Sequence, residues 1–187
     1  ADRYMAVLDP VKLVITNYPE TGEMLPMDNN PGDESRGIRE VPFSRELWVE
    51  REDYRKEPQN RKYFRMAPEK NVRLKGAYIL NIIGHEEDAD GNVTQINATY
   101  YPDSRSGSDT SGVKAKGTLH WVDATSAIDL EVRNYDKLFT DPTPMDHEDK
   151  DFMDFINPDS LKVTTAKGEP ALANAKPGDT FQFLRKG

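Results

Sequence analysis

The feature that most constrains the fold of this chain is a recurring alternation of apolar and polar residues. Successive side chains of a β-strand point to opposite faces, so a period of two is typical of strands. Helical periodicity is scarce, and the chain is therefore expected to be all-β. The alternating or β-branched runs predict strands at Val11–Ile15, Glu46–Glu50, Val72–Leu80, Val93–Tyr101, Lys114–Val122, Ile128–Phe139, Ser160–Thr165 and Thr180–Arg185.

The turn signals between these runs favour antiparallel barrels or sandwiches. Asp90-Gly91-Asn92 separates two alternating runs, which is a strong hairpin signal. Pro26–Arg39, Pro102–Gly112 and Asp141–Asp159 are rich in turn-forming or charged residues and are expected to be irregular. The last of them holds seven Asp/Glu and one Lys. A short helix over Lys150–Ile156 is expected there, with its aromatic and aliphatic side chains buried on one side.

A basic segment interrupts an acidic chain. Arg61–Lys75 contains six Lys/Arg, one Glu and the neighbouring rings of Tyr63 and Phe64, whereas the whole chain has a net charge of -8. Cations neutralise phosphates and aromatic rings stack on unpaired bases, so this mixture suits a single-stranded nucleic acid. A solvated basic face beside an acidic one explains the same pattern. Since the pI is about 5.0, any binding of nucleic acid is expected to be local recognition.

Several chemistries have no support in the sequence. The chain has no Cys, which excludes disulfides and thiolate catalysis and fits a cytoplasmic protein. Its histidines, at positions 85, 120 and 147, lack the spacing of metal ligands. Glu86–Gly91 resembles a calcium-binding loop, but Asn97 stands where the closing Glu is required, so a turn is expected. No phosphate-binding loop or membrane span is present, and the absence of an initial Met suggests an excised piece.

Seven segments, spread over essentially the whole chain, match one known protein family in their order and spacing. They are Arg3–Leu13, Glu40–Val49, Val72–Tyr78, Lys116–Val122, Phe139, Phe155–Leu161 and Phe181–Phe183. Together they resemble the C-terminal anticodon-binding region of bacterial glutaminyl-tRNA synthetases. This resemblance implies two tandem antiparallel β-barrels of the ribosomal protein L25-like type, with the distal barrel inserted into the proximal one. The implied boundaries are 1–60 and 134–187 for the proximal barrel and 61–133 for the distal barrel.

The resemblance also implies a function, which is recognition of the tRNA(Gln) anticodon loop by a chain that carries no catalytic residues. ATP and Mg would belong to the catalytic domain of a parent glutamine–tRNA ligase, a cytoplasmic and monomeric enzyme. Carried over residue by residue, Arg3 and Gln182 resemble readers of the middle base, Arg73 of the first base and Arg65 of the third. The remaining RNA-binding candidates are Arg185, Lys75, Lys62 and Tyr63.

This chain departs from the family pattern in the basic segment. Lys75 stands where Arg is common, Phe64 where a cation is expected and Lys62 where an amide is expected. A one-residue insertion lies within Pro58–Arg65. Lys114 and Lys116 match no base-reading position, so they are predicted to matter less than Arg73 for anticodon preference. If Arg3 and Gln182 read one base, the first and last strands must lie side by side.

Other readings remain open at this stage. The same module occurs in related glutamyl-tRNA synthetases, and a free-standing L25-like protein would bind ribosomal RNA. An enzyme using some of the 33 Asp/Glu residues is a further class, although no apolar setting singles out a catalytic pair. Structurally, Arg3 could be a frayed end, and Arg73, Lys75 and Gln182 could be ordinary outward-facing strand residues.

Overall fold

The computed structural model describes residues 1–58, 60 and 62–184. Its strands are β1 Asp2–Tyr4, β2 Ala6–Val7, β3 Pro10–Ile15, β4 Glu23–Asp28, β5 Ile38–Phe43, β6 Glu46–Glu50, β7 Asn71–Leu74, β8 Ile79–Glu87, β9 Val93–Tyr100, β10 Thr118–Leu119, β11 Val122–Asp123, β12 Ile128–Tyr135, β13 Leu161–Gly168 and β14 Phe181–Phe183. Short 3-10 helices are η1 Glu34–Arg36, η2 Arg51–Asp53, η3 Pro102–Ser104, η4 Phe152–Phe155 and η5 Pro170–Asn174.

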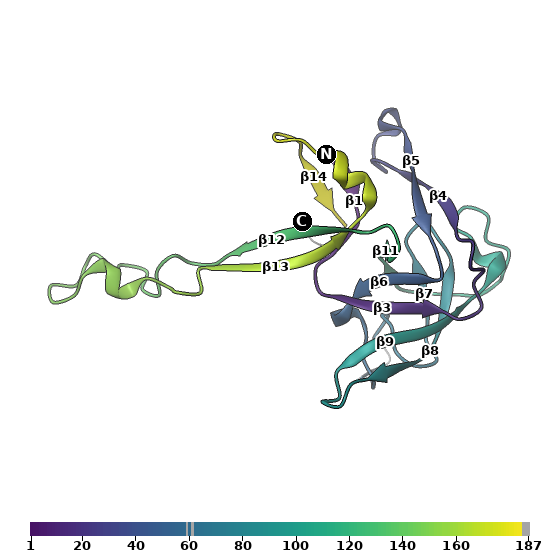
Figure 1. Ribbon diagram of the computed structural model, residues 1–187, viewed down its shortest axis with the longest axis horizontal. Coiled ribbons are helices and arrows are strands. Elements are labelled where there is room, and N and C mark those ends of the chain that lie inside the picture. The colour runs from purple at the N-terminus through teal and green to yellow at the C-terminus, as the bar shows by residue number, and fades with distance from the viewer. Residues whose placement is uncertain (59, 61, 185–187) are drawn as a thin grey trace.

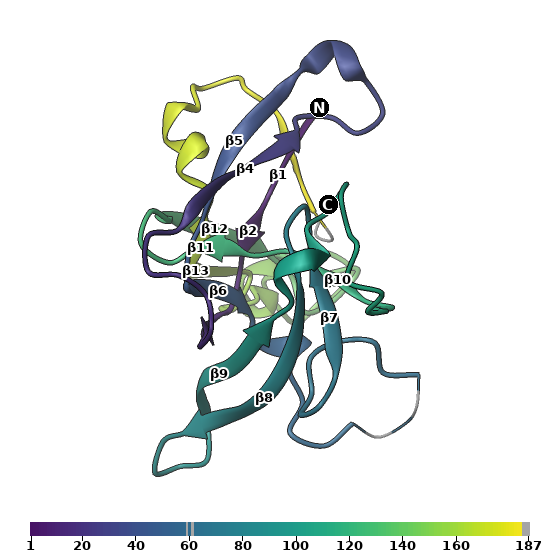
Figure 2. The same cartoon turned by 90° about the vertical axis from the view of Figure 1, so that its right-hand side faces the viewer.

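The strands form four sheets, and the prediction of an all-β chain is confirmed. The largest sheet has the order β10-β7-β8-β9-β3-β6-β11 and curls around the core (Figures 1 and 2). A second sheet has the order β12-β13-β2, and the pairs β4-β5 and β1-β14 complete the set. Most neighbouring strands in the described part of the chain are antiparallel. The exceptions are the parallel pairs β1-β14, β10-β7 and β3-β9.

Alternation along the strands builds the core. Val11, Leu13 and Ile15 of β3 are buried, and the residues between them are partly exposed. The same alternation buries Val72 and Leu74 of β7. Full burial of such an aliphatic side chain is worth about 1.5–3 kcal/mol. The period-two pattern of the sequence therefore maps directly onto one inward face.

A buried carboxylate links three parts of this core. Glu50, only 2% exposed, accepts hydrogen bonds from the backbone amides of Leu8 and Asp9. Its Oε1 also lies 3.2 Å from Nε2 of His120. Burial pulls the pKa of Glu50 upward, but these hydrogen bonds outweigh burial and hold the pKa below its ordinary value. His120 thus contacts a buried carboxylate of the core.

The single strand predicted over Val72–Leu80 is wrong. β7 ends at Leu74 and β8 begins at Ile79, and Gly76 between them adopts a φ of 66°. This left-handed conformation turns the chain back on itself and is one that glycine adopts readily. Lys75 therefore lies in a turn and does not share a strand face with Arg73. The predicted strand Lys114–Val122 is likewise reduced to β10 and the start of β11.

Two predicted loops were also wrong in part. Pro26–Arg39 contains the end of β4, η1 and the start of β5. β4 and β5 pair with each other, and Pro26 lies opposite Glu40. Sequence inspection missed this hairpin because its Pro, Gly and Asn residues are turn formers. The turn at Asp90-Gly91-Asn92 joins β8 to β9 as predicted.

The second loop belongs to an arm formed by residues 128–168. β12 and β13 pair along their whole length and project away from the body, and the connection 136–160 forms the tip (Figure 1). The predicted helix is only the 3-10 turn η4, and the predicted burial is wrong, since Phe152 and Ile156 are 42% and 38% exposed. The tip has no neighbouring sheet on which to bury them.

The predicted division into 1–60, 61–133 and 134–187 remains a prediction. The curled sheets are consistent with two barrels. However, β3 and β6 share the seven-stranded sheet with β7–β10, and β12 continues across residues 133 and 134. The helices described are all short, and none has the length and apolarity needed to cross a membrane.

Candidate nucleic-acid interface

The two ends of the chain meet in one parallel pair of strands. β1 pairs with β14 so that Arg3 lies directly opposite Gln182. The rings of Tyr4 and Phe181 meet edge to face with centroids 5.1 Å apart, and the amide of Leu184 donates to the carbonyl of Tyr4. The prediction that the first and last strands lie side by side is confirmed. Arg3 and Gln182 are therefore neighbours across this pair of strands.

Beside this pair lies a depression that we call the central pocket, with a volume of about 410 Å³. β1, β4, β7 and the loop after η3 all contribute to its walls. Among its described lining residues, one carries a carboxylate, Asp28, and five carry a positive charge. The lining cations are Arg3, Arg39, Arg73, Lys75 and Arg105.

The cations of the central pocket differ in how far they are neutralised. Arg39 makes a two-pronged ion pair with the buried Glu169, at 2.8 and 2.7 Å, and its guanidinium lies 4.4 Å from the centre of the Tyr4 ring. Arg73 pairs with Asp109 and Arg105 with Glu23. Within the described residues, the side chains of Arg3 and Lys75 form no ion pair, so their charges remain available to a ligand.

A second depression, the side pocket, has a volume of about 250 Å³. Its lining contains Tyr63, Phe64, Arg65, Glu69, Lys70, Asn71, Lys114, Lys116 and Gly117. Phe64 is 43% exposed, and the ammonium of Lys116 lies 5.2 Å from the centre of its ring. An exposed ring can stack on a base, and a neighbouring cation can neutralise the phosphate of the same nucleotide. Lys114 and Lys116 therefore lie with predicted RNA-binding residues, although their role stays a prediction.

Interactions with Asp53 hold the basic segment in place. Arg65 lies 3.4 Å from the carboxylate of the buried Asp53, and the Tyr63 hydroxyl donates to the Asp53 carbonyl. Burial raises the pKa of Tyr63, so its hydroxyl is a neutral donor at pH 7. The guanidinium of Arg55 lies 5.3 Å from the centre of the same ring. Tyr63 is thus held by the protein, which leaves Phe64 as the more exposed ring.

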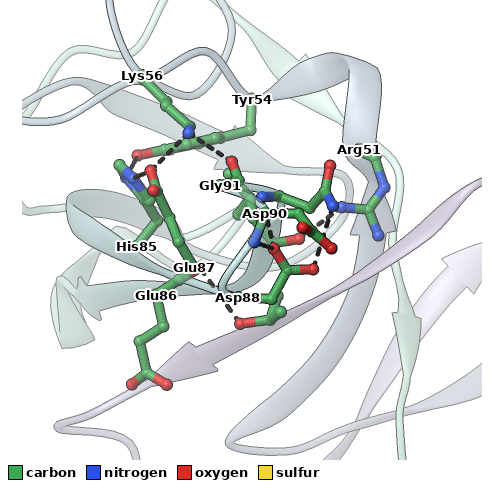
Figure 3. A network of polar contacts seen from close by, with 12 residues as sticks. Arg51, Tyr54, Lys56, His85, Glu86, Glu87, Asp88, Asp90 and Gly91 are labelled. Carbon is green, nitrogen blue, oxygen red and sulfur yellow. Dashed lines mark hydrogen bonds and ion pairs between the residues drawn. The ribbon is translucent and has the colours of Figure 1, made fainter.

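A polar network ties Tyr54 and Lys56, which precede the basic segment, to β8 and the β8-β9 turn (Figure 3). The Tyr54 hydroxyl lies 2.5 Å from Nδ1 of His85, and Nε2 of His85 lies 2.7 Å from Glu87. Lys56 contacts the same Glu87 carboxylate and donates to the carbonyl of Gly91. Lys56 and His85 lower the pKa of Glu87, so its carboxylate stays charged at neutral pH.

The β7-β10 pair connects the two pockets. Arg73 is opposite Thr118 in this pair, and both line the central pocket. Asn71 and Gly117, two and one residues earlier in the same strands, line the side pocket. Residues two apart in a strand are separated by about 6.6 Å. The two pockets therefore lie next to each other along the β7-β10 pair.

The remaining site predictions have mixed outcomes. Lys62 and Gln182 are exposed and line neither pocket. Arg185 lies outside the described residues. Sequence inspection missed Arg39, Arg105 and Asp109, because no local pattern shows that their segments approach β1 and β7. No cluster of three or more metal-ligating side chains occurs in the described part of the chain.

An all-β chain with two cation-lined pockets, one of them beside the exposed ring of Phe64, has the characteristics of a module that binds unpaired nucleic acid. Comparison with known families specifies the class further. Residues 1–101 and 118–187 each match a family model described as the anticodon-binding domain of class I tRNA synthetases for glutamate (E) and glutamine (Q). The chain belongs to this family of anticodon-binding domains.

Individual relatives agree with the family assignment. The chain is 52% identical to a glutamine–tRNA ligase of Rhodopirellula baltica, and 100% of the chain is covered. It is 50% identical to the corresponding ligases of Colwellia psychrerythraea and Clostridioides difficile, with 100% and 98% of the chain covered. It spans only 31%, 34% and 33% of the length of these three relatives.

Proposed function

We propose that this chain binds the anticodon loop of tRNA(Gln), with the central pocket receiving unpaired bases. The observation that carries the proposal is the convergence of Arg3 of β1, Arg73 of β7 and Lys75 of the following turn on one pocket. Three anticodon bases are unpaired, so their Watson–Crick edges are free to accept hydrogen bonds from such side chains. The pairing of Arg3 with Gln182 adds an amide, which can both donate and accept.

The family and its relatives support the wider assignment. The relatives are glutamine–tRNA ligases, so we propose that the chain is the anticodon-reading part of such an ATP-dependent enzyme, in the cytoplasm and as a monomer. Its ATP and Mg would be bound by another part of the enzyme. The family match favours this function over a free-standing ribosomal RNA-binding protein. A glutamyl parent is the alternative within the family.

Substitution of the paired residues tests the proposal. Arg3→Ala and Gln182→Ala should each reduce discrimination at the middle anticodon base far more than at its neighbours. A well-formed contact to a base edge is worth about 1–3 kcal/mol of discrimination, by analogy with DNA readout. Competition among anticodon stem-loops that differ at one base, followed by fluorescence, measures this. Stem-loops with glutamine and glutamate anticodons distinguish the two parents.

Arg133→Ala is the matched control, because Arg133 is an exposed arginine of the arm that pairs with Glu131. It should leave all stem-loop affinities unchanged. Equal weakening toward every stem-loop by Arg3→Ala and Gln182→Ala would contradict base reading and indicate contacts to the RNA backbone. Binding that is equal for all anticodons in the unchanged protein would contradict the proposed function itself.

A further inference from the structure

The loop that follows η3 holds the guanidinium of Arg73 before any ligand arrives. Nη1 of Arg73 donates to the carbonyl of Ser104 at 2.8 Å and to the hydroxyl of Ser106 at 3.3 Å. Nη2 donates to the carboxylate of Asp109 at 2.5 Å. Nε has no acceptor among the described residues. The side chain is 21% exposed and lines the central pocket, so a ligand there meets a guanidinium of fixed orientation.

Asp109 is itself held in place. Its second carboxylate oxygen accepts hydrogen bonds from the amide and the hydroxyl of Ser111, at 2.9 and 2.7 Å. These bonds, and then Arg73, lower the pKa of Asp109, so the group is anionic at neutral pH. The buried Ser104 anchors the loop by accepting a hydrogen bond from the amide of Ile79. The negative charge beside Arg73 is therefore a fixed part of the site.

This fixed charge affects phosphates and bases differently. A phosphate approaching Nη2 of Arg73 meets a carboxylate within hydrogen-bonding distance of the same nitrogen, and like charges so close repel each other. The edge of a base is uncharged and requires only donors in the correct plane, which a guanidinium already paired with a carboxylate still supplies. Rejection of a wrong ligand by a repulsive element is a common source of specificity.

We propose that Asp109 is a specificity-determining residue, which reserves Arg73 for an uncharged base edge and excludes phosphate from that side of the central pocket. This inference rests on the proposed function and deepens it. Lys75, which lacks such a partner in the described structure, remains a cation of the same pocket that can accept phosphate.

Asp109→Asn removes the charge and retains the shape and an acceptor. We expect stem-loops changed at the base that Arg73 reads to bind about tenfold more tightly, and the matched stem-loop to change less than about threefold. One additional phosphate contact should make the slope of log K against log salt more negative by about 0.7. Asp103→Asn is the matched control, because Asp103 is exposed in the neighbouring η3 and its side chain has no hydrogen bond in the described structure. It should change neither quantity.

A second measurement is independent of RNA. Inorganic phosphate is titrated while the Nε–H resonance of Arg73 is followed by NMR, with circular dichroism to confirm that each variant is folded. The Asp109→Asn protein should show a saturable shift and the unchanged protein none. Equal shifts in both proteins would overturn the proposal. So would an Asp109→Asn protein that binds the matched stem-loop more weakly and binds the changed stem-loops no more tightly than the unchanged protein does. Failure of the unchanged protein to bind any stem-loop would instead refute the proposed function, and the phosphate titration would still decide the role of Asp109.

Discussion

At the scale of single residues, one glycine controls how closely the basic segment packs against β10. A Cβ at Gly117 would lie 1.7 Å from the carbonyl oxygen of Phe64, far inside contact distance. The obstacle is backbone and has little freedom to move aside. Only a residue without a side chain lets the backbone of the side pocket close in this way.

We therefore predict that Gly117→Ala lowers the free energy of unfolding by about 1–3 kcal/mol, the usual cost of inserting a methyl group into a packed site. Urea denaturation measures this. Gly84→Ala is the control, because nothing lies within 4 Å of a Cβ at Gly84 and its φ is not left-handed. That variant should differ from the unchanged protein by less than about 0.5 kcal/mol. Equal stability of the two variants would show that the close approach at Gly117 is relaxed in solution.

At the scale of elements, the sequence predicted the strands whose inward residues alternate, such as β3, β6 and β9. It failed where local residue types did not decide the structure. Alternation alone predicts one strand up to Leu80, but the turn at Gly76 divides it into two. Pro26 was expected in a loop, but it lies in β4, a strand of a two-stranded sheet. The two pockets depend on the parallel pairs β1-β14 and β7-β10. Such pairing joins residues far apart in the chain, and no local pattern encodes it.

The arm leaves many of its apolar side chains exposed. In the described part of the chain, twelve large apolar residues are exposed; eight of them lie on the arm, and none of the eight belongs to the core cluster. They are Tyr135, Leu138, Met145, Phe152, Met153, Ile156, Leu161 and Val163. The tip is held by local bonds, such as that from the Asp136 amide to the Ser160 carbonyl.

Replacement of residues 137–159 by an Asn-Gly turn should therefore leave the body folded. We expect the thermal midpoint, followed by circular dichroism, to change by less than about 2 °C, because no core contact is lost. Leu13→Ala is the comparison, since Leu13 is fully buried and its truncation should cost about 2–5 kcal/mol. A midpoint lowered by the arm replacement as much as by Leu13→Ala would mean that the arm stabilises the body.

At the scale of the whole molecule, charge is separated between the arm and the pockets. The arm segment 141–159 carries seven Asp/Glu and one Lys, so -6 of the total net charge of -8 lies there, and -2 is left for the rest of the chain. The arm projects away from the body that carries the pockets (Figure 1). Eight paired residues of β12 extend about 26 Å at a rise of 3.3 Å per residue. An RNA in the pockets therefore interacts with this acidic tip only over a long range.

The range of that repulsion depends on salt, and so should the effect of removing it. The Debye length is about 8 Å at 0.15 M salt and about 30 Å at 0.01 M. We predict that the Asn-Gly replacement of 137–159 changes the affinity for the anticodon stem-loop less than twofold at the higher salt, by the same screening argument. At the lower salt it should tighten binding severalfold. A fluorescence titration of both proteins across this range measures the difference.

The double variant Phe152→Ser and Phe155→Ser keeps the charge of the arm, and its affinity should match that of the unchanged protein at every salt concentration. A salt-independent effect of the replacement would show that the arm touches the RNA directly, since contact at short range is screened far less than repulsion across solvent.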